Sequence, residues 1–191
     1  WLTGAAQWAF KDFSTPVRPG NPVPYMNQKG VIQRDFTKKE SYYVFQSYWT
    51  EKPMVHIYGH SWPVCWGKDD EKRLVKVYSN CKEIELFLNG ESLGTKKRNV
   101  EMYPACGLFW NVQFKKGKNE LIAKAKTDDG HIRDKIELVY QTEKWGKATE
   151  LVLTEEAIDD TYSWLKVKVL DKNGILCLDA RNVVEFFAIG D

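Results

Sequence analysis

The chain has 191 residues, of which 43% are hydrophobic and 14% aromatic, so it can bury a core and does not have a disordered composition. Its 28 basic and 26 acidic residues are interleaved and leave a net charge of +2, which argues against nucleic-acid binding. No apolar run approaches the roughly 18 residues that cross a bilayer, and the first residues lack a signal-peptide pattern. Composition therefore indicates a folded protein for which neither nucleic acid nor membrane is an expected partner.

The first candidate binding residues lie in the N-terminal segment and the loop that follows it. Residues 4–13 are predicted to form a strand, and Trp8 in that strand offers a flat ring face that can stack on a sugar. The loop over about 14–36 is rich in proline, which excludes regular structure. Within it, Asn27 and Lys29 are two residues apart, so an extended backbone points both side chains the same way. Such an amide and ammonium pair suits an anionic or hydroxyl-rich ligand.

A helix is predicted over about 39–49. Thr37 and Glu40 have the spacing of a capping box, and Pro53 marks the end of this unit. Aromatic residues recur at intervals of three and four along the helix. We expect this stripe to be core rather than a ligand site, and the helix to pack on the domain that follows. The stripe consists of Tyr42, Phe45, Tyr48 and Trp49.

Residues 54–142 show short strands at regular spacing, which is the pattern of an antiparallel sandwich. Ile84, Leu86 and Leu88 alternate with charged residues and are predicted to face the core. Asn89-Gly90 predicts a two-residue hairpin turn, because a type I′ turn needs positive φ at both positions. Other predicted core residues are Val75, Val77, Leu121, Ala123 and Ala125. The expected strands are 54–58, 73–79, 83–89, 92–98, 107–114, 119–126 and 131–141.

A second boundary is predicted at Trp145-Gly146. Beyond it we expect three more strands, near 148–153, 162–170 and 183–189. Three strands are too few for an immunoglobulin-like sandwich, which takes about 100 residues. These strands therefore indicate the beginning of a further domain.

Two tryptophans lie close together between the first two expected strands. Trp62 and Trp66 occupy a turn-rich segment and are candidates for a sugar-stacking platform. The alternative, which we prefer, is a loop that packs at a joint between domains. His56 and His60 fall in and beside a predicted strand, which would separate their rings by about 13 Å. With no third ligand in the sequence pattern, we expect no metal site.

The cysteines show no C-x-x-C pairing and no repeated spacing, so they signal neither a zinc site nor a disulfide framework. We expect four buried free thiols. The four are Cys65, Cys81, Cys106 and Cys177.

The N-terminal motifs carry a family resemblance. The run Gln7-Trp-Ala-Phe-Lys-Asp-Phe13, together with residues 26–49 beginning Met26-Asn-Gln-Lys-Gly30, resembles the last βα unit of the catalytic TIM barrel in glycoside hydrolase family 2. That family contains β-galactosidases and β-glucuronidases. Residues 79–90 are similar to a hairpin of the immunoglobulin-like domains that follow this barrel. The resemblance implies a mainly β chain: a last barrel βα unit over 1–52, an immunoglobulin-like antiparallel β-sandwich over 53–144, and a partial second β-sandwich over 145–191.

The resemblance also implies roles for the candidate residues. Trp8 would line the sugar pocket, with Asn27 and Lys29 near the sugar, and in the glucuronidase branch an Asn-x-Lys pattern contacts the sugar carboxylate. The two catalytic glutamates of the family lie on earlier barrel strands, so this chain alone is expected to be inactive. Glu40 and Glu51 lie on or just after the helix and lack the paired setting that retaining hydrolysis needs.

We therefore expect the C-terminal part of a retaining exo-glycosidase that hydrolyses terminal β-linked sugars. β-Galactosidase is the main expectation and β-glucuronidase the first alternative. A non-catalytic carbohydrate-binding or scaffolding β-sandwich is the second alternative. The expected partners are a β-linked saccharide and the upstream barrel, and the resemblance implies no cofactor. By analogy, the location is periplasmic or secreted in a bacterium, and the sequence leaves the oligomeric state open.

Overall fold

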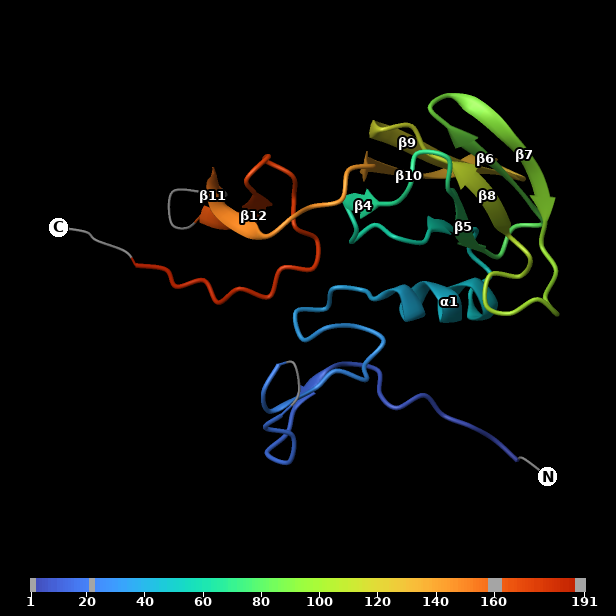
Figure 1. Ribbon diagram of the computed structural model, residues 1–191. Helices are drawn as coiled ribbons and strands as arrows, with labels where there is room; N and C mark the ends of the chain where they lie inside the picture. The colour runs from blue at the N-terminus through green and yellow to red at the C-terminus, as the bar shows by residue number, and fades with distance from the viewer. Residues whose placement is uncertain (1–2, 21–22, 158–162, 188–191) are drawn as a thin grey trace.

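Strands make up most of the regular structure in the computed structural model, which describes residues 3–20, 23–157 and 163–187. One helix, α1 (Glu40–Trp49), occurs among these residues. It lies between the N-terminal segment and a body of stacked sheets, while a separate hairpin lies to one side (Figure 1). The prediction of a mainly β chain containing a β-sandwich is therefore confirmed. None of the described helical residues forms a span long and apolar enough to cross a membrane.

Two sheets form the central sandwich. The smaller has the order β3-β5-β8, and the larger has the order β4-β10-β9-β6-β7. All neighbours are antiparallel except β4, which runs parallel to β10. The bounds are β3 Val55–Ile57, β4 Val64–Trp66, β5 Lys72–Ser79, β6 Glu83–Leu88, β7 Glu91–Lys97, β8 Phe109–Gln113, β9 Gly117–Thr127 and β10 Gly130–Gln141. The seven strands expected in this region are all present, whereas β4 was not predicted.

The core lies between these two sheets. Along β9, buried and more exposed residues alternate, as a strand with one covered face requires. Leu88 is half-buried and packs against this core, and the other predicted core residues are all buried in it. They are Val75, Val77, Ile84, Leu86, Leu121, Ala123 and Ala125. The β6–β7 hairpin turns at Asn89 (φ 51°) and Gly90 (φ 87°), with Leu88 paired to Glu91. The predicted two-residue turn is therefore confirmed.

Helix α1 packs on the sandwich, but through a different face from the predicted one. Val44 is buried against Tyr78 and Ala105, with Tyr43 packed beside them. Most of the predicted stripe points elsewhere, and Trp49 is 76% exposed. The expectation that the stripe packs on the sandwich is thus wrong for Tyr42, Phe45 and Trp49, whereas Tyr48 does meet the β7–β8 loop, with its ring 6.0 Å from that of Tyr103. The helix is apolar on two faces, and the smaller side chains of the Val44 and Ser47 face allow the closer approach.

The predicted capping box is also absent. Lys39 is the N-cap residue of α1 and makes no side-chain capping bond. The Glu40 carboxylate instead accepts hydrogen bonds from the Gly59 N–H (3.0 Å) and His56 Nε2 (3.1 Å). A tertiary contact has therefore replaced the local one that the spacing suggested.

The N-terminal segment does not form the expected continuous strand. Among the described residues of this segment, the paired strands are β1 (Phe13–Ser14) and β2 (Met26–Asn27), both inside or beside the predicted irregular loop, and isolated bridges join Ile32 to Lys11 and Lys38. Residues 9–12 run beside residues 29–32 through separate backbone hydrogen bonds. A strand needs a neighbouring strand along its whole length to pair its backbone hydrogen bonds, and among the described residues only the short stretch 29–32 lies beside residues 9–12.

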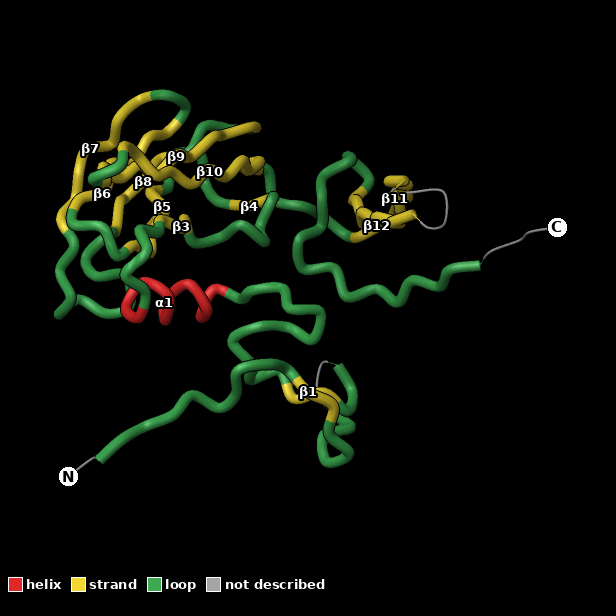
Figure 2. Tube along the Cα trace, turned by 180° about the vertical axis from the view of Figure 1, so that it is seen from behind, coloured by secondary structure: helices red, strands yellow, loops and turns green. Residues whose placement is uncertain are grey.

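The C-terminal region is a hairpin followed by an irregular segment. β11 (Ala148–Ala157) and β12 (Ser163–Asp171) are antiparallel and lie apart from the sandwich, joined to it by residues 142–147 (Figure 2). The expectation of a third strand over 183–189 is wrong for residues 183–187, which are irregular. Residues 188–189 lie outside the described part of the chain. The domain boundaries expected after residues 52 and 144 remain a prediction.

Candidate functional site

A buried carboxylate holds the loop that contains Asn27 and Lys29. Asp12 is 6% exposed, and its Oδ1 accepts hydrogen bonds from the Gly30 N–H (2.9 Å) and the Lys39 ammonium (2.7 Å). Lys39 also donates to the Gln28 carbonyl at 2.9 Å. We call Asp12, Gly30 and Lys39 the clamp. It ties the N-terminal segment, the loop and the start of α1 to one another, and sequence reasoning missed Asp12 and Lys39 because no local spacing links them.

Gly30 is the tightest point of the clamp. A Cβ atom at this position would lie 2.3 Å from the Asp12 nitrogen and 2.5 Å from the Lys11 carbonyl carbon. These are backbone atoms that cannot swing aside as a side chain would. The loop can therefore press on residues 11–12 only because residue 30 has no side chain.

The structure brings the three predicted sugar-site residues into one region. The Lys29 carbonyl accepts hydrogen bonds from the Ala9 N–H (3.2 Å) and Gln7 Nε2 (3.4 Å), on either side of Trp8. Asn27 is buried, and its Oδ1 accepts the Lys29 N–H at 3.1 Å. The side chains of Trp8 and Lys29 are exposed. Asn27 thus shapes the loop, whereas Lys29 and Trp8 present a cation and a ring to the outside.

The Trp8 side chain has one aromatic neighbour among the described residues. Its ring meets Phe13 edge to face, with centroids 6.1 Å apart, and the peptide bond between Trp8 and Ala9 is cis. A groove of about 810 Å³ runs between this segment and α1. The aromatic residues of the helix stripe contribute to its wall, which includes Phe10, Val31, Tyr42, Phe45 and Trp49. Three of the four stripe residues therefore face the N-terminal segment and open space, not the sandwich.

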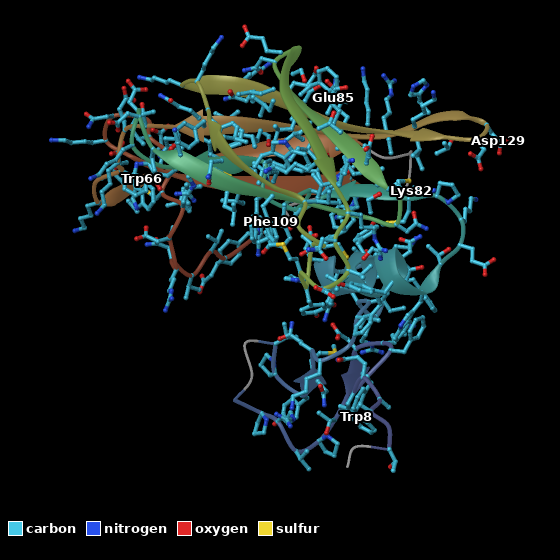
Figure 3. The ribbon with its side chains drawn as sticks, turned by 90° about the vertical axis from the view of Figure 1, so that its right-hand side faces the viewer. Trp8, Trp66, Lys82, Glu85, Phe109 and Asp129 are labelled. Carbon is cyan, nitrogen blue, oxygen red and sulfur yellow. The ribbon has the colours of Figure 1, made fainter. Side chains whose placement is uncertain are left out.

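The second aromatic candidate lies far from the first. Figure 3 shows Trp8 on one side of α1 and Trp66 on the other, within the sandwich. Trp66 meets Trp145 edge to face at 5.9 Å, and Trp62 meets Tyr58 in the same way at 5.0 Å. Both tryptophans line a hollow of about 400 Å³ whose other wall comes from the C-terminal segment. Contact with Trp145 at the predicted boundary favours the domain-joint interpretation for Trp66, while Trp62 stays half exposed.

The histidine prediction requires a correction. The rings of His56 and His60 do not lie 13 Å apart but stack with centroids 4.7 Å apart. β3 ends at Ile57, and Gly59 (φ 114°) then turns the chain so that His60 folds back over His56. The strand was expected to continue to residue 58, and this early turn explains the error.

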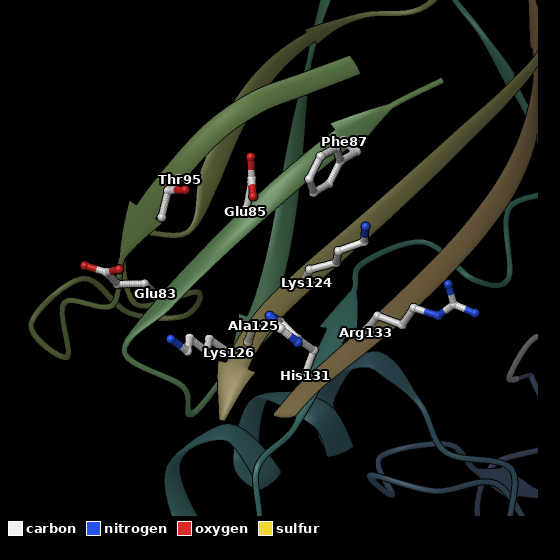
Figure 4. Close-up of a pocket in the computed structure, with 9 residues that line it drawn as sticks. All are labelled: Glu83, Glu85, Phe87, Thr95, Lys124, Ala125, Lys126, His131 and Arg133. Carbon is white, nitrogen blue, oxygen red and sulfur yellow. The ribbon is translucent and has the colours of Figure 1, made fainter. Parts of the chain in front are cut away.

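A further hollow, of about 620 Å³, lies on the outer face of the larger sheet (Figure 4). Glu83 and Glu85 on β6 stand near basic residues of β9 and β10. Lys124 already lies over the Phe87 ring, with its Nζ 4.5 Å from the centroid. Because the opposite charges largely balance and the ring is covered, this surface is a solvated sheet face.

All four cysteines are free thiols, two of them buried and two half-buried. Burial raises the pKa of Cys65 and of Cys177 above the ordinary thiol value. A protonated thiol is a poor nucleophile and a poor metal ligand. These two cysteines therefore have the character of packing residues rather than of reactive ones.

Comparison with known proteins links this chain to glycosidases. A family model described as a domain of unknown function, DUF4982, matches residues 70–132. A protein of Formosa agariphila named "Putative beta-glucuronidase" is 47% identical over 186 residues, which cover 97% of this chain and 23% of that protein. β-Galactosidase BoGH2A of Bacteroides ovatus is 29% identical over 201 residues, covering all of this chain and 22% of that protein.

A solved structure gives the same picture. The crystal structure of Parabacteroides merdae β-glucuronidase matches with a TM-score of 0.87 at 56% identity, covering 93% of this chain and 23% of that one. The chain thus spans about a quarter of the length of the relatives that it matches. The similarity includes both the clamp region and the sandwich, since it extends over nearly the whole chain.

Proposed function

Because this chain is homologous along almost its full length to glycoside hydrolases of family 2, we propose that it is part of a retaining exo-β-glucuronidase. Relatives named β-glucuronidase share 47% and 56% identity with it, whereas the β-galactosidase shares 29%. The comparisons thus favour the first alternative over the main expectation of a β-galactosidase. The catalytic glutamates of the whole enzyme would lie outside this chain.

The proposal is carried by the exposed side chain of Lys29, on a loop that the clamp fixes and whose backbone is hydrogen-bonded to the residues on either side of Trp8. A glucuronide differs from a galactoside or glucoside by a carboxylate, and an ammonium on a preorganised loop is a suitable partner for that charge. Trp8 would supply an apolar surface for the sugar ring. Asn27 would act through the loop, because its side-chain oxygen already holds the Lys29 N–H.

The rest of the chain would hold Trp8 and Lys29 in place at the proposed sugar site. The groove between the N-terminal segment and α1 exposes an aromatic surface, in which Phe10 and Trp49 are 64% and 76% exposed. Apolar patches of this kind are covered in larger assemblies. In our proposal the barrel of the parent enzyme covers the groove, and the sandwich supports the helix from the other side.

The test is to replace Lys29 in the parent enzyme. A charge-assisted hydrogen bond is worth about 1.5 to 3 kcal/mol, so Lys29→Ala should reduce kcat/KM for a nitrophenyl β-glucuronide roughly 10- to 150-fold. Activity on the matching galactoside, if measurable, should change little. Lys52→Ala removes an exposed lysine beyond α1 and serves as the control.

Two results would contradict the proposal. One is an equal loss on glucuronide and galactoside, which would mean that Lys29 supports the fold rather than the carboxylate. The other is an enzyme that prefers galactosides before any substitution, which would restore the main expectation from the sequence.

A further inference from the structure

Two histidines and a carboxylate meet beneath the start of α1. The ligand atoms that His56, His60 and Asp134 can offer all lie within 4.8 Å of one another. His60 Nε2 is 2.7 Å from Asp134 Oδ2, and His56 Nδ1 is 3.9 Å from the same oxygen. His56 lies in β3, His60 in the turn after it and Asp134 in β10, so only the folded chain brings them together.

The ring of His56 is held in a defined orientation. Its Nε2 contacts Glu40 Oε2 at 3.1 Å, which leaves Nδ1 on the side of Asp134. Tyr43 stacks on the ring from the helix side, with centroids 3.4 Å apart and planes 5° apart. A carboxylate on the far nitrogen of a histidine is the outer-shell arrangement that orients metal-binding histidines and raises their basicity.

The local charge favours a cation. Asp134 and Glu40 are 18% and 25% exposed in their side chains, so both carboxylates are largely withdrawn from water. Their ion-pair partners among the described residues are histidines, and no lysine or arginine lies within pairing distance. Two partly buried carboxylates whose ion-pair partners are histidines alone make a site that a divalent cation suits.

We propose that His56, His60 and Asp134 form a binding site for a borderline divalent transition-metal ion, with Zn²⁺ the best match. Two imidazole nitrogens and one carboxylate oxygen are ligands that Zn²⁺ accepts, whereas Mg²⁺ and Ca²⁺ prefer all-oxygen sets. The fourth position would be taken by water.

Binding requires a small rearrangement of one ligand. The two rings are now nearly parallel, with 14° between their planes, so their in-plane lone pairs do not converge on one point. His60 is the ligand that moves, because its side chain is 41% exposed whereas that of His56 is 7% exposed. The ion then takes the place of the direct contact between His60 Nε2 and Asp134 Oδ2, which are now 2.7 Å apart.

The proposed site would act as a structural joint. Through Glu40 it is linked to α1, through His56 and His60 to β3 and the turn that follows it, and through Asp134 to the larger sheet. Asp134 also accepts the Ile57 N–H at 2.7 Å. An ion here would fasten the helix beside the sugar-binding loop to the sandwich, and the inference does not depend on the sugar proposed above.

In the test, the chain is first freed of metal with EDTA, the EDTA is removed, and Zn²⁺ binding is then measured by calorimetric titration. We expect one ion per chain, and Co²⁺ at the same site should give the intense visible bands of four-coordinate cobalt with nitrogen and oxygen ligands. His60→Ala should abolish both signals, while His131→Ala, which removes the remaining histidine of the chain, should leave both unchanged. Glu40→Gln should weaken Zn²⁺ affinity about 10- to 100-fold, as loss of an outer-shell partner does.

Several outcomes would overturn the inference. They are no stoichiometric binding by the unsubstituted chain, binding that survives His60→Ala, and binding that His131→Ala removes. The cobalt spectrum of the unsubstituted chain needs no variant, so it tests the site even if a substitution impairs folding. A melting curve of metal-free His60→Ala that matches the metal-free parent chain would show that the lost binding is not lost structure.

Discussion

Replacing Gly30 with alanine tests whether the clamp positions the loop that we propose to bind the sugar. The new Cβ would stand 2.3 Å from the Asp12 nitrogen, whereas nonbonded heavy atoms settle at about 3.5 Å or more. The two backbone segments would therefore have to separate by roughly 1 Å. The Gly30 N–H bond to Asp12, now 2.9 Å long, would then be lost.

The expected cost combines two effects. Overpacking costs about 1 to 3 kcal/mol, and a hydrogen bond to a buried carboxylate is worth about 1.5 to 3 kcal/mol. We therefore expect the free energy of locally opening residues 9–12 and 29–32 to fall by roughly 2.5 to 6 kcal/mol. The sandwich should keep its stability, because its core does not include these residues.

Hydrogen exchange followed by mass spectrometry is the appropriate assay. The amides of Asp12, Val31 and Ile32, which donate backbone hydrogen bonds across this contact, should lose protection in Gly30→Ala. Gly20→Ala is the matched control, since a Cβ there meets no atom within 4 Å. Equal protection in the two variants would refute the clamp, as would unchanged glucuronide hydrolysis by a parent enzyme carrying Gly30→Ala.

Three further predictions concern the core, acid stability and activity. Leu86→Ala should lower the free energy of unfolding by about 2 to 5 kcal/mol in urea because Leu86 is fully buried, whereas Leu74→Ala, at 56% exposed, should change it by less than about 1 kcal/mol. Hydrogen bonds from backbone N–H groups, first that of Gly146, lower the pKa of the Asp171 carboxyl in the folded chain. The stability that the ionised carboxylate contributes is therefore complete above the unfolded pKa near 3.9 and is lost as the pH falls through the lower folded pKa. Asp171→Asn should remove this acid dependence from unfolding followed by fluorescence between about pH 5 and 2, and an unchanged pH dependence would contradict the prediction. Finally, the isolated chain should release no nitrophenol from nitrophenyl β-glucuronide, and turnover that survives repurification would contradict the assignment of the catalytic glutamates to the rest of the enzyme.

Local patterns in the sequence were enough to predict the sandwich. Alternation along β9 and β6 identified the buried face because successive side chains of a strand point to opposite sides. Asn89-Gly90 identified a turn because few residue pairs tolerate positive φ at both positions. Each of these signals is complete within about ten residues, so no knowledge of distant partners was needed.

The candidate site was only partly accessible in this way. Trp8, Asn27 and Lys29 could be chosen from their chemistry and spacing, and the fold brings them into one region. Asp12 and Lys39 could not, because they lie 27 residues apart and meet only through the path of the intervening loop. That path depends on a close approach at Gly30, which the sequence shows only as a glycine.

Tertiary structure alone decided which apolar face of α1 the sandwich covers and where β3 ends. Both the aromatic stripe and the Val44 face satisfy helical periodicity, and the choice between them depends on the shape of the surface they meet. Likewise, the turn at Gly59 brings His60 onto His56 and toward Asp134, more than 70 residues farther along the chain. The sequence determined these residue types and their local preferences, but their convergence is set by free energies of packing and hydrogen bonding that exist only between distant segments.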